Sequence, residues 1–162
     1  MKKLIVSDAT PIISFSRIGK LELFHQIVGE ILIPEEVSRE LFEYKKADVK
    51  SIKHCKWINV GAVKSKSDVE LLMPTLDRGE SEVIILSKEL KASLVIIDEL
   101  SARKVAMMLN LPLIGTVGLL IAARKKGLID KVKPVWDKMI AQGVRYGEEF
   151  YRKVLSEIGE GG

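Results

Sequence analysis

The 162-residue sequence has one cysteine, two histidines and no long run of apolar residues. Cys55 has no partner for an intrachain disulfide, and with His25 and His54 it gives no spaced set of ligands for zinc. No apolar run approaches the roughly 20 residues of a membrane-spanning helix, and the first residues lack the apolar core of a signal peptide. These absences predict a cytoplasmic protein without membrane association, in which any bound metal is held by oxygen atoms.

Two enzyme signatures are also missing. A nicotinamide dehydrogenase carries a Gly-x-Gly-x-x-Gly motif after its first strand, and the sequence has none there. A haloacid-dehalogenase-type phosphatase needs a second aspartate two residues after Asp8, where this chain has Thr10. We therefore exclude both enzyme classes.

The charge of the chain is moderately basic. The net charge is +4 with a pI of about 9.1, and lysines and arginines cluster within 45–56 and at 124–126. Such patches attract a polyanionic partner, but a solvated surface rich in lysine and glutamate explains the same composition. Charge alone therefore does not identify a nucleic acid as the partner.

The size and composition are those of one folded domain. Hydrophobic residues make up 47% and charged residues 30% of the chain, as in soluble globular proteins. A single domain typically spans roughly 100–200 residues. We therefore predict one domain over residues 1–158 and a flexible, glycine-rich tail at 159–162.

Short apolar runs alternate with helical patterns along the chain. Strands are expected at 3–7, 30–33, 57–60, 94–98 and 112–115. Helices are expected at 11–24, 34–44 with Pro34 first, 77–90, 99–109, 117–126, 134–142 and 147–158. Residues 47–66 are expected to hold a helix end, the brief strand and a loop. The alternation predicts an α/β fold with a central parallel sheet, helices on both faces, and a ligand cleft at the carboxyl edge of the sheet.

Two of the predicted strands end in an aspartate, Asp8 and Asp98. There, each carboxylate would stand at the carboxyl edge of the sheet, where open α/β proteins bind ligands. Structural roles are equally open. Asp98 can cap the helix expected from residue 99, and Asp8 can order the turn before Pro11.

Glu40 lies partly on the inner side of its predicted helix. It is roughly 65° from the centre of the apolar stripe formed by Val37, Leu41 and Tyr44. A carboxylate turned toward a core is costly unless it is paired or binds a metal. A salt bridge to a lysine is therefore the alternative role for Glu40.

Glu80 shows a similar pattern, because Val83 and Ile84 lie on its side of the helix. Asp77 and Glu80 also have the spacing of a capping box, in which the Glu80 carboxylate binds the backbone of Asp77. A metal-binding role and a capping role are therefore both open for Glu80.

Taken together, the four acids Asp8, Glu40, Glu80 and Asp98 indicate a metal site. Crowded like charges are costly, and proteins keep them where a hard divalent cation neutralises them. A set of oxygen ligands suits Mg²⁺ or Mn²⁺. Such an ion orients a water, lowers its pKa and screens charge developing on a phosphate. The set therefore predicts a catalytic, metal-binding site for phosphodiester hydrolysis.

Five segments carry a recognisable pattern, at 7–13, 33–41, 76–82, 97–99 and 115–120. Their order resembles that of the PIN-domain nucleases, in particular a prokaryotic branch related to VapC-type toxin ribonucleases, over about residues 3–155. By that resemblance Asp8, Glu40, Glu80 and Asp98 form the family's acidic quartet. Glu80 then stands in place of the aspartate common in other branches.

The sequence departs from that branch after the fourth strand. The branch usually has paired aspartates followed by Gly-Arg, whereas this chain has Asp98-Glu99 and then Ala-Arg103. Glu99 is expected either to reach a metal through another ligand or, preferably, to pair with Arg103 at i, i+4. Thr10 and Thr116 follow strands closely, where a hydroxyl can hold a metal-bound water or a phosphate oxygen, or can cap a helix or turn.

The resemblance implies a Mg²⁺- or Mn²⁺-dependent endoribonuclease that leaves 5′-phosphate and 3′-hydroxyl ends on RNA. It also implies one specific role, the toxin of a toxin–antitoxin pair, with a small antitoxin protein as partner. The alternative is a catalytically weak PIN fold that binds RNA or a partner protein, and the presence of all four acids argues against it. We also expect a homodimer, because the apolar helices at 21–24 and 34–44 exceed what one side of a small sheet can cover.

Overall fold

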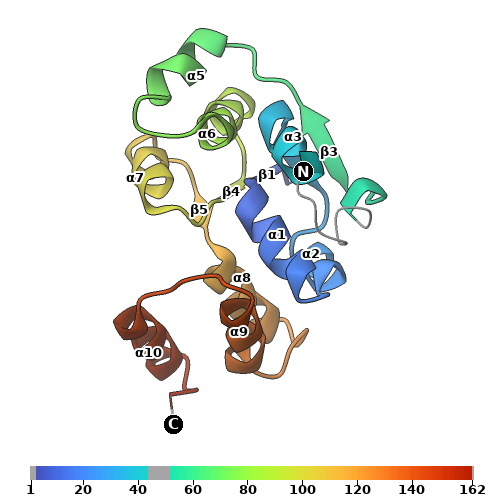
Figure 1. The fold of residues 1–162 in the computed structure, drawn as a ribbon, viewed down its shortest axis with the longest axis vertical. Coiled ribbons are helices and arrows are strands. Elements are labelled where there is room, and N and C mark those ends of the chain that lie inside the picture. Colours follow the sequence, from blue (N-terminus) through green and yellow to red (C-terminus); the bar gives the residue numbers. More distant parts are fainter. Residues whose placement is uncertain (1–2, 44–51, 162) are drawn as a thin grey trace.

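A computed structural model describes residues 3–43 and 52–161, which contain a five-stranded sheet (Figure 1). The strands are β1 (Ile5–Ser7), β2 (Ile31–Pro34), β3 (Ile58–Gly61), β4 (Leu94–Ile96) and β5 (Leu113–Ile114). They lie in the order β3-β2-β1-β4-β5, and every neighbouring pair is parallel. The predicted α/β fold with a parallel central sheet is confirmed.

The two neighbouring strands β1 and β4 lie at the centre of the sheet, with Ser7 in register with Ile96. Val6 of β1 and Val95 of β4 are fully buried, because strands covered on both faces offer no position for a solvated side chain. This double burial explains the apolar runs that precede Asp8 and Asp98. The pairing continues to the first acid, since the Asp8 N–H donates to the Ile96 carbonyl at 3.0 Å.

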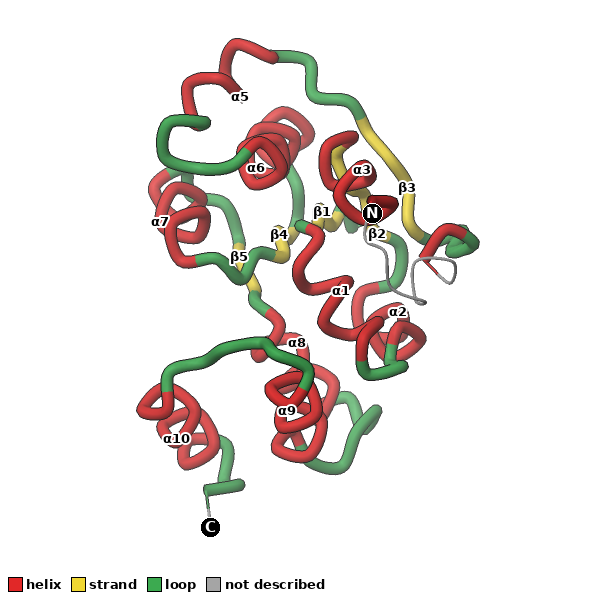
Figure 2. The backbone as a smooth tube through the Cα atoms, viewed as in Figure 1, coloured by secondary structure: helices red, strands yellow, loops and turns green. Residues whose placement is uncertain are grey.

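Helices cover the sheet from two sides (Figures 1 and 2). One layer holds α5 (Lys66–Leu72), α6 (Arg78–Leu90) and α7 (Leu100–Met108), of which α6 packs directly on β1, β2 and β4. The other layer holds α1 (Ala9–Arg17), α2 (Leu21–Val28), α8 (Thr116–Lys125), α9 (Val132–Ala141) and, beside α9, α10 (Glu148–Glu157). α3 (Glu35–Glu43) packs against both α1 and α6 and so joins the layers. Within the described ranges, no helix combines the length and the apolar character needed to cross a membrane.

The helix predicted at 11–24 is in fact two helices. α1 ends at Arg17 and α2 begins at Leu21, with Gly19 between them at a φ of 68°. This is the left-handed region, which glycine enters without the steric penalty that other residues face. The prediction of one helix was wrong because apolar residues recur on both sides of the break, so their spacing did not reveal it.

Two further elements differ from the sequence prediction. α5 has no counterpart in it, because Val69 is the one buried residue of this helix and no apolar stripe marks it. Pro34 ends β2 instead of beginning a helix, and α3 begins at Glu35. β3 confirms the brief strand. Tyr44, the lysines at 45, 46 and 50, and the first part of the segment predicted to hold a helix end, residues 47–51, lie outside the described residues.

The C-terminal segment folds back onto the start of α9. The Glu160 carboxylate accepts hydrogen bonds from the backbone N–H groups of Val132 (2.9 Å) and Lys133 (2.8 Å) and pairs with Arg124 at 2.9 Å. Glu160 is therefore anchored, although it belongs to the predicted flexible tail, whose last residue lies outside the described ranges. The single domain over residues 1–158 stays a prediction.

The helices named in the homodimer prediction cover their own apolar side chains. Leu23 and Phe24 of α2 and Val37 and Leu41 of α3 are buried within the chain. Phe42 is the exception, with 45% of its surface exposed. The reason given for a homodimer therefore does not hold for these helices, and the homodimer itself stays a prediction.

Candidate active site

The carboxyl edge of the sheet carries the two strand-end aspartates. Asp8 directly follows β1, and Asp98 lies two residues after β4. Because β1 and β4 are parallel neighbours, both residues reach the same edge. The structure places both where the apolar runs indicate, and their side-chain contacts define what each can do.

Asp8 is a buried acid beside other acids. Its side chain is 6% exposed and accepts a hydrogen bond from the Ala9 N–H at 2.8 Å, which caps α1. Burial raises the pKa of Asp8 to about 7; the Ala9 hydrogen bond opposes this, and the charges of Glu40, Asp77 and Glu80 add to it. The structural role is therefore present, and Asp8 also lies near enough to three other acids for their charges to raise its pKa.

Glu40 reaches the same place through the packing of α3 on α6. Its carboxylate lies directly against Gly79 at the start of α6, where an added Cβ would be 3.0 Å from Glu40 Cδ. Burial raises the pKa of Glu40 to about 7, and negative charge, foremost that of Asp77, raises it further. No lysine or arginine of residues 3–43 and 52–161 forms an ion pair with Glu40, so the salt-bridge alternative finds no support there.

Glu80 forms the capping box that its spacing indicates. The Glu80 N–H donates to Asp77 Oδ1 at 2.7 Å, and Glu80 Oε1 accepts from the Asp77 N–H at 3.0 Å. The pKa of Glu80 is nevertheless raised, first by burial and then by the charges of Asp77 and Glu99, against the effect of the backbone hydrogen bond. Glu80 therefore combines a structural contact with a place among the crowded acids.

Asp77 is the acid that the sequence prediction omits from the site. Its negative charge raises the pKa of Asp8, Glu40 and Glu80. The capping box was the signal that located Asp77, but spacing along one helix does not show what the helix start faces. That depends on how α6 packs against β1 and α3.

Asp98 is fixed by the start of α8. Its two oxygens accept hydrogen bonds from the Thr116 N–H at 2.7 Å and the Thr116 Oγ1 at 2.6 Å. The sequence pattern allowed Asp98 to cap the next helix. Glu99 has this role instead, because its side chain accepts a hydrogen bond from the Ala102 N–H at 2.8 Å and so caps α7. Thr116 is buried with its hydroxyl directed at Asp98, whereas Thr10 is exposed in the first turn of α1.

The expected ion pair between Glu99 and Arg103 is not formed. Glu99 turns toward the start of its own helix as a cap, and Arg103 Nη1 instead donates to the Ile97 carbonyl at 2.7 Å. The prediction of the pair was wrong because the i, i+4 spacing does not distinguish a first-turn glutamate that caps from one that pairs. Arg103 thus holds the backbone immediately before Asp98.

Tyr146 is a second residue that sequence reasoning missed. It lies between α9 and α10 and packs edge-on against Trp136, with ring centroids 5.2 Å apart. Burial and the nearby charge of Asp98 both raise the pKa of its phenol. The C-terminal part of the chain therefore reaches the acid-bearing edge, and no local motif marks this approach.

The described residues bring three predicted acids into one electrostatic group and add a fourth. The group consists of Asp8, Glu40, Glu80 and Asp77, while Asp98 lies along the same edge and is bound to Thr116. Within these ranges, no three His, Cys, Asp or Glu side chains are arranged closely enough to ligate one ion. The donor atoms are carboxylate oxygens, which suit a hard divalent cation in chemistry. Asp8, Asp77, Glu80 and Asp98 each accept a hydrogen bond from a backbone N–H group.

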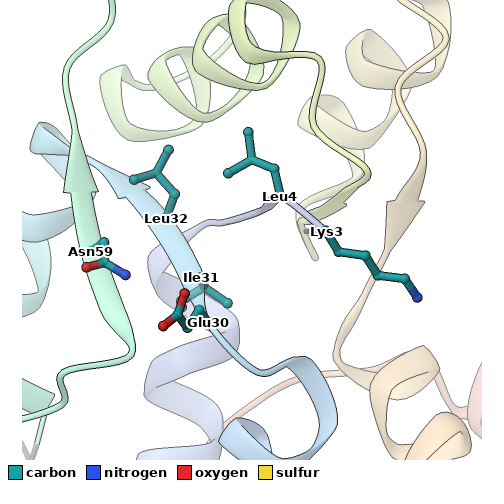
Figure 3. Close-up of a pocket in the computed structure, with 6 residues that line it drawn as sticks. All are labelled: Lys3, Leu4, Glu30, Ile31, Leu32 and Asn59. Carbon is teal, nitrogen blue, oxygen red and sulfur yellow. The ribbon is translucent and has the colours of Figure 1, made fainter. Parts of the chain in front are cut away.

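A hollow on the molecule lies at a different place, near the amino ends of β1, β2 and β3 (Figure 3). It is lined by Lys3, Leu4, Glu30, Ile31, Leu32 and Asn59. None of the four predicted acids contributes to it. The candidate site is therefore the acid-bearing carboxyl edge and not this hollow.

Comparison with protein families identifies the family to which the sequence is similar. A family model described as a PIN domain matches residues 4–160, almost the entire chain. No curated protein matches the sequence.

Proposed function

The chain belongs to the PIN-domain family, and on that basis we propose that it is a Mg²⁺- or Mn²⁺-dependent endoribonuclease. PIN domains are generally nucleases that use divalent metal ions. The proposal specifies RNA as the substrate, hydrolysis within the strand as the reaction, and Asp8, Glu40, Glu80 and Asp98 as the metal-binding acids.

The crowding of Asp8 and Glu40 at the sheet edge is the observation that carries the proposal. Asp8 is buried and Glu40 is partly buried, each near other acids whose negative charge raises its pKa, and Glu40 has no basic partner in the described part of the chain. Such an arrangement opposes folding unless it gains something from a ligand. A divalent cation bound between these carboxylates would offset their mutual repulsion, because each carboxylate would be attracted to the cation.

The side chains have distinct tasks in this site. Asp8 is held by the Ala9 N–H and Asp98 by Thr116, so both carboxylates have fixed positions at the edge. Glu80 keeps Oε1 on the Asp77 backbone, and its second oxygen would contribute to the metal site. A cation bound there would activate a water and screen charge developing on the scissile phosphate.

An RNA-cleavage assay with defined metal content tests the proposal. Wild-type protein is expected to cut RNA in millimolar Mn²⁺ or Mg²⁺, to leave 5′-phosphate and 3′-hydroxyl ends, and to lose activity in excess chelator. Asp8→Asn removes the most buried carboxylate of the set and is expected to be inactive. Full cleavage in chelator, or by Asp8→Asn, would contradict the proposal.

The second candidate is a PIN fold that binds RNA or a protein without efficient catalysis. The engagement of Glu80 in the capping box and the open arrangement of the acids favour it. Tight RNA binding by the wild type without metal-dependent cleavage would establish this alternative.

We also propose two partners that the family resemblance implies. A small antitoxin protein would identify the chain as a toxin; growth arrest on expression, relieved by a protein encoded next to it, is the expected sign. For a homodimer, we propose α7 as the contact surface, because it exposes several apolar side chains in one helix, with Leu100 72% and Met107 64% exposed. A monomer mass by light scattering at micromolar concentrations would refute the dimer.

A further inference from the structure

Two glycines in the described ranges lie against acids of the proposed site. An ideal Cβ placed on Gly79 would overlap Glu40 Oε1 and would lie 3.0 Å from Glu40 Cδ. A Cβ placed on Gly115 would lie 2.9 Å from Asp98 Oδ1 and 3.1 Å from Arg103 Nη1. Carbon and oxygen atoms that are not bonded normally stay farther apart than this, so each carboxylate occupies the space that a side chain would need.

Backbone conformation does not explain why these positions are glycine. Gly79 is in the first turn of α6, and Gly115 is in the extended conformation with φ −105° and ψ −179°. Any residue adopts these conformations. The glycines at 19, 29, 127, 143 and 159 differ, because all five have a positive φ.

Other close-packed glycines meet different kinds of atoms. A Cβ on Gly118 would meet Ile114 Cγ1 at 2.6 Å, and one on Gly61 would meet Leu32 Cδ1 at 3.2 Å. Those two glycines make room for apolar packing. Only at Gly79 and Gly115, among the described glycines, is the room taken by a carboxylate.

We propose that Gly79 and Gly115 are positioning residues, which seat the Glu40 and Asp98 carboxylates directly on the backbone at the starts of α6 and α8. The inference rests on the proposed function. Each seat lets an acid approach a helix start more closely than a methyl group would allow. An added methyl group at either position would meet the end of an acidic side chain and not the backbone, so the carboxylate should shift and the fold should remain. At Gly115 the shift also has to strain the hydrogen bonds between Asp98 and Thr116.

Gly79→Ala is the first test. It should weaken metal binding while leaving the stability of the fold unchanged or slightly higher. Calorimetric titration with Mn²⁺ is expected to show affinity about 10- to 100-fold weaker than that of the wild type, as for other residues that orient metal ligands. In chelator, the melting temperature is expected to be unchanged or to rise by about 2–4 °C, because alanine is favoured over glycine in a helix. Gly115→Ala should weaken Mn²⁺ binding in the same direction but less, since its overlap is smaller.

Gly118→Ala is the matched control. It lies in α8, three residues after Gly115, and introduces the same methyl group against Ile114 instead of an acid. It is expected to lower the melting temperature through overpacking and to keep the Mn²⁺ affinity of the wild type.

A rescue experiment separates displacement of Glu40 from general damage. Glu40→Asp shortens the side chain and should weaken Mn²⁺ binding on its own. Adding Gly79→Ala to Glu40→Asp is then expected to cause at most a small further loss, because the overlap has been removed and the two changes are not additive.

The outcomes distinguish the inference from the proposed function. A wild type that binds Mn²⁺ and cleaves RNA, with Gly79→Ala binding Mn²⁺ equally well, overturns the inference alone. A full additional loss in the double variant also overturns it. A wild type that neither binds Mn²⁺ nor cleaves RNA overturns the proposed function, and the inference with it.

Discussion

Two regions of the molecule are rich in carboxylates and hold them in opposite ways. At the carboxyl edge, Asp8 is buried and Glu40 partly buried beside other acids, and the pKa of each is raised to about 7. Around α9 and α10, burial also favours the neutral forms of Asp137 and Glu160, but hydrogen bonds and positive charges outweigh it and lower both pKa values. Asp137 is bound by Lys133 at 2.9 Å, and Glu160 by Arg124 at 2.9 Å.

The difference separates acids that stabilise the fold through their partners from acids whose mutual repulsion opposes folding. When a buried carboxylate is paired with a cation or a hydrogen-bond donor, the pairing offsets the free-energy cost of removing the carboxylate from water. Acids that lie close to one another lower the stability of the fold unless a ligand neutralises them. Asp137 and Glu160 in the C-terminal region therefore already have partners within the chain. At the carboxyl edge the acids repel one another, and the cation of the proposed nuclease function would relieve this repulsion.

The largest expected contrast is in catalysis. Asp8→Asn should reduce RNA cleavage by about 10³-fold or more, equivalent to about 4 kcal/mol, because a metal-binding charge is lost. Asp137→Asn makes the same chemical change in the other region and should leave cleavage per folded molecule unchanged. Initial rates in saturating Mn²⁺ measure both, and a similar loss in the two variants would break the comparison.

The second contrast is the pH dependence of stability in chelator. Asp8 and Glu40 have folded-state pKa values of about 7, above the ordinary values of 3.8 and 4.5, so the folded state binds protons more tightly than the unfolded state. Their contribution is favourable below about pH 4 and is lost as pH rises toward 7, at a slope of at most about 1.4 kcal/mol per pH unit per group. Asp137 and Glu160, with lowered pKa values, contribute in the opposite sense and lose their contribution in acid.

Urea unfolding between pH 4 and 8 measures this difference. The wild type in chelator should lose stability toward pH 7, and Asp8→Asn should reduce that loss. Saturating Mn²⁺ should remove most of it, because the ion binds only the folded, ionised site. A pH profile that Asp8→Asn leaves unchanged would show that Asp8 does not titrate in this range.

Glu160→Gln tests the paired region. The carboxylate is 4% exposed and binds two backbone N–H groups as well as Arg124. Loss of its charge should destabilise the protein by about 2 kcal/mol, as for other hydrogen bonds to charged groups, with or without metal. Chemical denaturation in both conditions checks this, and an effect that depends on Mn²⁺ would link the C-terminal segment to the metal site.

The sequence predicted the fold and the edge positions of the acids because both depend on local pattern. Buried parallel strands require apolar runs, so Asp8 and Asp98 stood out at the point where the runs end. The break at Gly19 and the helix α5 escaped prediction, because neither changes the apolar spacing in a recognisable way.

The local sequence pattern could not predict contacts between elements that are distant in the sequence. Asp77 joins the acidic group only because α6 packs on β1 and against α3, and Tyr146 approaches Asp98 from the end of the chain. The choice of Glu99 instead of Asp98 as the cap of α7 depends on Thr116, which takes both Asp98 oxygens. Each outcome was decided by a competing partner from another element.

The smallest expected effect is at Glu80, which both caps a helix and belongs to the crowded acidic group. Its Oε1 completes a capping box with Asp77, and its charge adds to the crowding of the other acids. Glu80→Gln keeps an acceptor for the Asp77 N–H and removes the charge, whereas Glu80→Ala removes both. The two variants therefore separate capping from charge at one position.

In chelator, Glu80→Ala should destabilise the protein by about 0.5–2 kcal/mol through the lost cap. Glu80→Gln should be neutral or stabilising by up to about 0.5 kcal/mol, since glutamine also serves in a capping box and repulsion is relieved. In saturating Mn²⁺ the wild type should become more stable than Glu80→Gln, because a ligand stabilises most the folded state that binds it most tightly. Thermal and urea unfolding of the wild type and both variants, in chelator and in saturating Mn²⁺, measure these differences in stability. Equal destabilisation by Glu80→Gln with and without Mn²⁺ would assign Glu80 to the cap alone.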